Sequence, residues 1–143
     1  AADIARFTER TLASNIVGIF NVAGPAAPTT MSQLLDECAL VASEFGAQPA
    51  TIAWAARECL LKHGVQEWSE LPLWLVDPQY AGLLEMSNEK AIGAGFRSSA
   101  IADTIRSVLD WAIADVPSNQ TGMSAEREAE LLEKCCPHHS EVA

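Results

Sequence analysis

The segment that most constrains the fold is residues 18–35, GIFNVAGPAAPTTMSQLL, which joins an apolar run to a proline-rich turn and a capped helix. Residues 17–23 are nearly all apolar and rich in β-branched and aromatic side chains, a pattern typical of a strand covered on both faces. Thr30 and Gln33 have the spacing of a capping box, which satisfies two free amides at the start of a helix. This strand, turn and helix predict an α/β or α+β fold.

The remaining pattern predicts few strands and about five or six helices. Helical spacing of apolar residues and capping signals predict helices over 3–13, 31–45, 55–63, 87–94, 101–112 and 124–134, with Asp3 and Ser124 as candidate caps. Short strands are predicted over 51–54 and 83–86, and a proline-broken loop over 66–82. A chain of 143 residues is the usual size of one domain. We therefore expect a single domain over 1–134 and a disordered tail over 135–143.

The charge balance limits the partners of the chain. It has 9 basic and 19 acidic residues, a net charge of −10, and such a charge repels phosphate backbones and anionic lipid surfaces. No apolar stretch approaches the roughly 20 residues that span a bilayer, and the first residues have no signal-peptide pattern. We therefore expect a cytoplasmic protein that binds neither nucleic acid nor membrane.

The four cysteines, Cys38, Cys59, Cys135 and Cys136, are few for a disulfide scaffold and are expected to be reduced thiols. The tract 135–139, CCPHH, is rich in soft ligands, but adjacent cysteines lack the usual gap between zinc ligands. An incidental tail is favoured over a metal site there. Cys59 and His63 lie one helical turn apart, where a buried cysteine beside a helix-terminal histidine is favoured over an activated thiolate. No metal-binding or catalytic residue is predicted.

Four segments, in this order, resemble the carboxy-terminal part of an extended short-chain dehydrogenase/reductase of the NAD-dependent epimerase/dehydratase family. Asp3-Ile4-Ala5 resembles the family's Arg-Asp-aliphatic-Ala segment, with Ala2 in place of the arginine. Residues 18–25, GIFNVAGP, are similar to a late strand and turn of that family. Residues 63–68 with 71–75 are similar to a substrate-side excursion, and 87–96 with 101–111 to the family's closing helices.

The resemblance implies NAD or NADP as the cofactor of a complete family member, yet this chain lacks the residues that would bind and use it. The family's glycine-rich strand–turn–helix has no counterpart, because Gly93-Ala94-Gly95 follows a predicted helix and is better interpreted as a helix stop. The family also uses a tyrosine four residues before a lysine. Tyr80 is the only tyrosine here, and Leu84 occupies the lysine position. No cofactor is therefore expected to bind this chain alone.

Five large side chains are the candidate substrate-binding residues: Trp54, Trp68, Trp74, Tyr80 and Met86. Small-molecule pockets are mostly apolar, so these residues favour a pocket lining. A lid that packs over a core explains the same pattern equally well.

Two functions follow from these observations. The first is a C-terminal fragment of an NAD(P)-dependent epimerase, dehydratase or reductase-like protein, which binds a small-molecule substrate and is inactive alone. The second is a free-standing, non-catalytic module that binds a small molecule or a protein. Under either, self-association is expected through an exposed sheet edge or apolar face.

Overall fold

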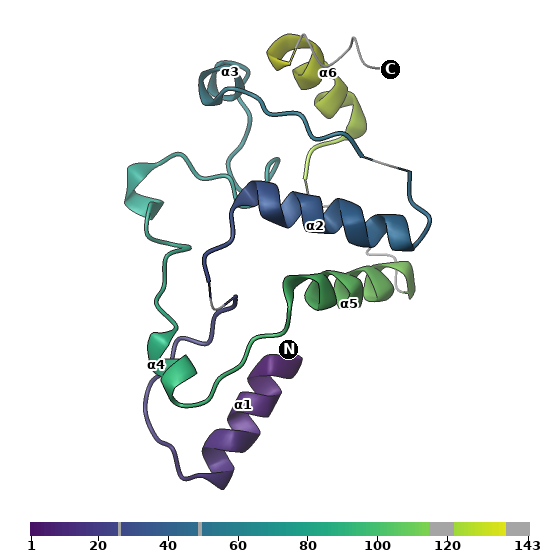
Figure 1. Cartoon of the computed structure of the whole chain (residues 1–143). Coiled ribbons are helices and arrows are strands. Elements are labelled where there is room, and N and C mark those ends of the chain that lie inside the picture. The colour runs from purple at the N-terminus through teal and green to yellow at the C-terminus, as the bar shows by residue number, and fades with distance from the viewer. Residues whose placement is uncertain (26, 49, 115–121, 137–143) are drawn as a thin grey trace. The chain divides into compact units, whose positions relative to one another are not determined.

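The computed structural model describes residues 1–25, 27–48, 50–114 and 122–136, and every regular element in these ranges is a helix (Figure 1). The chain divides into two compact units, which are described separately. Unit 1 comprises Ala1–Pro49 and Gly82–Val116, and unit 2 comprises Ala50–Ala81 and Pro117–Ala143. Whether 1–134 folds as one domain stays a prediction.

The helices described in unit 1 are α1 (Ala2–Ala13), α2 (Met31–Glu44), α4 (Glu89–Gly93) and α5 (Ile101–Ala114). The capping box at the start of α2 is confirmed. The backbone N–H of Gln33 donates to the Thr30 hydroxyl, and the backbone N–H of Thr30 donates to the side-chain oxygen of Gln33. Helices α2 and α5 lie side by side (Figure 1). A forked ion pair joins them, with Arg106 Nε and Nη2 at 2.8 and 2.9 Å from the Glu44 carboxylate oxygens.

The core of unit 1 is aromatic and connects α1 to the segment around α4. Phe7 is only 6% exposed and contacts Phe20 and Phe96 edge-on, at ring-centre distances of 5.5 and 5.6 Å. Edge-to-face contacts of this kind place the positive ring edge on a negative ring face. Ala91, which is fully buried, completes the cluster. Three parts of the chain that are distant in sequence therefore share one core.

The predicted strand at 17–23 is wrong, and with it the predicted α/β or α+β fold class. No strand or sheet is found in the described ranges, and no backbone–backbone hydrogen bond there involves residues 17–23. A strand requires a neighbouring strand to satisfy its backbone groups, and none of the described residues forms one beside this segment. Val17 and Ile19 are 90% and 86% exposed, so the apolar run predicted as buried faces outward at these two positions.

Two side-chain amides instead join this segment and the turn after it to Ser87 and Asn88, which precede α4. Asn88 Nδ2 donates to the carbonyl oxygens of Ala23 and Pro25 at 2.7 and 3.2 Å, and Asn21 Nδ2 donates to the Ser87 carbonyl at 3.3 Å. The predicted strands at 51–54 and 83–86 are also wrong, because both segments are irregular.

Unit 2 contains α3 (Arg57–Lys62), the 3₁₀ helix η1 (Pro78–Tyr80) and α6 (Ala125–Cys135). The cap of α6 is as predicted, since the Ser124 hydroxyl accepts from the Arg127 amide. Helices α3 and α6 contact each other around Leu60, Val65 and Leu131, which are 5–8% exposed.

A disulfide between Cys59 and Cys135 also joins α3 to α6. The expectation of reduced thiols is therefore wrong for this pair, while Cys38 and Cys136 are free. The spacing could not predict the pairing because the two cysteines are 76 positions apart.

Of the helices that the structure describes, none is long and apolar enough to cross a membrane.

Candidate functional site

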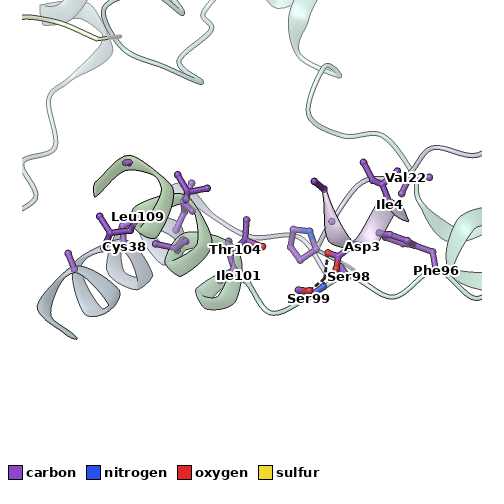
Figure 2. Close-up of a pocket in the computed structure, with 18 residues that line it drawn as sticks. Asp3, Ile4, Val22, Cys38, Phe96, Ser98, Ser99, Ile101, Thr104 and Leu109 are labelled. Atoms are coloured by element: carbon purple, nitrogen blue, oxygen red, sulfur yellow. Dashed lines mark hydrogen bonds between the residues drawn. The ribbon is translucent and has the colours of Figure 1, made fainter. Parts of the chain in front are cut away.

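Unit 1 contains an apolar groove with a volume of about 720 Å³. Its walls come from the start of α1, the segment 22–25, the facing sides of α2 and α5, and residues 96–99. Pockets that bind small molecules have volumes of about 300–1,000 Å³ and a mostly apolar lining. The lining includes Ile4, Val22, Cys38, Phe96, Thr104 and Leu109 (Figure 2). The groove therefore has the size and lining of a ligand site.

A small polar cluster interrupts this apolar lining. Figure 2 shows Asp3, Ser98 and Ser99 between Val22, Ile4 and Phe96 on one side and the residues of α2 and α5 on the other. The Asp3 carboxylate accepts from the Ser99 backbone N–H at 2.9 Å and from the Ser99 hydroxyl at 2.6 Å, and Arg6 also donates to it. A few polar groups in an apolar groove fix the orientation of a ligand.

The bonds from Ser99 favour the ionised form of Asp3. Its backbone N–H, followed by its hydroxyl, holds the pKa of Asp3 below the ordinary value of an aspartate, because both donate to the charged form. The predicted role of Asp3 as a helix cap is wrong, since the N-cap of α1 is Ala1 and no side chain caps it. At neutral pH the groove thus contains a carboxylate that can accept a hydrogen bond from a ligand.

We expect the Asp3→Asn variant to be less stable than the wild type near neutral pH. A carboxylate whose pKa is lowered in the folded state contributes stability above its unfolded pKa of about 4, and this contribution disappears as the pH falls through the folded value. The difference in melting temperature between the two proteins should therefore be largest at pH 7 and shrink below pH 4. Asp110→Asn, on the exposed side of α5, is the control and should show no such trend. A difference independent of pH would contradict this role of the Asp3 charge.

The five predicted substrate-binding residues do not line this groove. Trp54, Trp68, Trp74 and Tyr80 belong to unit 2, and Met86 belongs to unit 1. The structure brings Trp68 and Trp74 together, because the Trp68 amide donates to the Trp74 carbonyl at 3.2 Å. Trp74 packs against the core of unit 2, and the other four are largely exposed. Their role in substrate binding stays a prediction.

Sequence reasoning missed the polar cluster of the groove. Asp3 and Ser99 are 96 positions apart, so no local pattern connects them. The one available signal was that Asp3 lies in a segment that resembles a family motif, although the motif alone did not indicate a partner for it.

The second chemical feature is a group of three possible metal ligands in unit 2. The ligand atoms of Cys59, His63 and Cys135 all lie within 4.8 Å of one another, and all three residues are half-buried. The predicted proximity of Cys59 and His63 on one helical turn is confirmed, and Cys135 joins them from the end of α6.

Comparisons of this chain with protein-family models, with curated proteins and with solved structures found no match.

Proposed function

We propose that this chain is the substrate-binding part of an NAD(P)-dependent epimerase, dehydratase or reductase-like protein, and that it does not catalyse a reaction alone. The groove of unit 1 would hold the substrate. The observation that carries this proposal is that three of the four segments resembling that family contribute to the walls of one groove. These segments contain Asp3, Val22 and Phe96. Helix α5, which overlaps the last of them, and helix α2, which follows the second, complete the walls.

The lining defines a class of substrate. Most lining side chains are apolar, so the substrate would be a largely apolar small molecule. Asp3 is ionised and Ser98 carries a hydroxyl, so the substrate would also have a hydroxyl, amine or amide that donates to them. Hydride transfer would belong to a nicotinamide cofactor bound elsewhere, since this chain has neither a glycine-rich turn that follows a strand nor a Tyr-x-x-x-Lys pair.

A neutral apolar amine tests the groove. We expect N-phenyl-naphthylamine to bind the full chain with a one-to-one, saturable rise in fluorescence. Thr104→Trp places an indole in the groove and should weaken this binding at least about tenfold. Ser107→Trp is the matched control, because Ser107 is an exposed small residue of the same helix that does not line the groove. Equal affinities of the two variants would contradict ligand binding in the groove.

The lack of a cofactor-binding motif in this sequence allows a second test on the same protein, which measures its melting temperature. A ligand that binds only the folded state raises the melting temperature. NAD(H) and NADP(H) should therefore leave the melting temperature of this chain unchanged, and a saturable shift at submillimolar cofactor would refute the proposal that the cofactor binds elsewhere. The proposal includes a cytoplasmic location, where a nicotinamide enzyme meets its cofactor.

A second candidate is a protein-interaction module, which the exposure of Val17 and Ile19 favours. Their segment lies outside any helix and has backbone groups without backbone partners in the described ranges, and such a segment can associate with another chain. Light scattering at high concentration should then show a dimer or larger species, which Val17→Ser/Ile19→Ser converts to monomer. A monomeric wild type would exclude self-association through this segment.

A further inference from the structure

The ends of α3 and α6 place two thiols and an imidazole at one point of unit 2. We infer that Cys59, His63 and Cys135 form a zinc site in the reduced protein and that the Cys59–Cys135 disulfide is the oxidised alternative of the same site. This inference does not rest on the proposed function, because the cluster belongs to unit 2 and the groove to unit 1.

The donor set fits zinc. Thiolate and imidazole are the ligands that Zn²⁺ prefers, at about 2.3 Å from sulfur and 2.0 Å from nitrogen in a tetrahedral arrangement. These lengths place neighbouring ligand atoms roughly 3.5–3.8 Å apart. The three ligand atoms here already lie within 4.8 Å of one another, so small side-chain rotations can reach this geometry. Three protein ligands leave a fourth position for water or another small ligand.

The contacts around the cluster hold it together without the disulfide. Leu60, Val65 and Leu131 form a buried cluster between α3 and α6, and Cys135 packs against it. Arg127 of α6 donates from Nη2 to the carbonyl oxygen of His63 at 2.5 Å, which fixes the end of α3 against α6. Cys135 is the last residue of α6, where the helix dipole favours a cation.

The two states interconvert by balanced chemistry. A dithiol breaks the S–S bond by supplying two electrons and two protons, and it becomes a disulfide itself. A phosphine supplies the two electrons and takes the oxygen of one water to become its oxide, and the two protons of that water complete the two thiols. Zinc binding then releases both protons, because the ligands are thiolates. In the reverse direction an oxidant such as a small disulfide takes two electrons from the thiolates, and the zinc ion leaves.

Cobalt(II) titration of the full chain tests the site. The background variant is Cys38→Ser/Cys136→Ser/His138→Gln/His139→Gln, which removes the other cysteines and the two histidines of the tail. After phosphine reduction we expect one equivalent of cobalt to give the visible bands of a tetrahedral ion and a thiolate charge-transfer band, and zinc should abolish both. The oxidised protein should show neither.

His63→Gln, which leaves both thiols in place, should weaken cobalt binding at least about tenfold, and Cys59→Ser should remove the charge-transfer band.

Three results would overturn the inference. The first is the absence of a charge-transfer band in the reduced background protein. The second is equal cobalt affinity with His63→Gln, because binding would then not involve the imidazole. The third is binding by the oxidised protein, which has no thiolate at this site. Formation of the disulfide on reoxidation of His63→Gln shows that this variant keeps α3 and α6 together, so a loss of affinity cannot be assigned to unfolding.

Discussion

Replacement of Phe7 by alanine is expected to destabilise unit 1 by about 3–5 kcal/mol, the cost of removing a buried phenylalanine. Phe7 is 6% exposed and contacts both Phe20 and Phe96, so its loss leaves a cavity at the centre of the unit's core. Both the burial of the ring and two edge-to-face contacts disappear. A small domain has about 5–15 kcal/mol of stability in total, so this one change removes a large share of it.

Urea unfolding followed by circular dichroism measures this effect, and hydrogen exchange of peptides from α1 and residues 87–96 assigns it to unit 1. Leu12→Ala is the matched control, because Leu12 belongs to the same helix and is 75% exposed. That control should change the free energy of unfolding by less than about 0.5 kcal/mol. Similar losses for the two variants would show that Phe7 is not a core residue.

Reduction of the Cys59–Cys135 disulfide is expected to lower the stability of the metal-free protein by up to about 4.5 kcal/mol. A cross-link between residues 76 positions apart removes much of the freedom of the unfolded chain, and the loop-closure relation gives this upper value. The urea midpoint of the oxidised protein should therefore lie well above that of the reduced protein without metal. Zinc should restore part of the loss, because a ligand that binds only the folded state stabilises it.

The control for this comparison is Cys38→Ser/Cys136→Ser, which keeps the cross-link and should respond to reductant like the wild type. Cys59→Ala/Cys135→Ala should not respond. Equal midpoints for oxidised and reduced wild type, with the cross-link verified by mass spectrometry, would contradict a stabilising role for the disulfide.

The features predicted correctly from the sequence are those whose causes are local. Thr30 and Gln33 are three positions apart, and Ser124 caps the helix that immediately follows it, so residue type and spacing are sufficient. The periodicity of apolar residues predicted α2 and α5 for the same reason.

The wrong and the missing predictions have a common physical cause. In each case the structure depends on a partner segment or residue that is distant in sequence or absent. The pattern at 17–23 indicates an apolar extended segment, but a sheet also requires neighbouring strands, and the described chain provides none. The same limit hid the disulfide of Cys59 and the bonds from Ser99 to Asp3, because their partners lie 76 and 96 positions away. Neither the groove nor the three-ligand cluster is visible in a local pattern.

The central claim is that the groove of unit 1 binds an apolar small molecule, and the reactivity of Cys38 tests it most directly. Cys38 lines the groove, and in the oxidised Cys136→Ser protein it is the one free thiol of the four cysteines. The measurement is the rate of alkylation of Cys38 with and without N-phenyl-naphthylamine at about 100 times its dissociation constant, where about 1% of the grooves are empty. We predict that alkylation slows at least tenfold. An unchanged rate at saturation would contradict the claim.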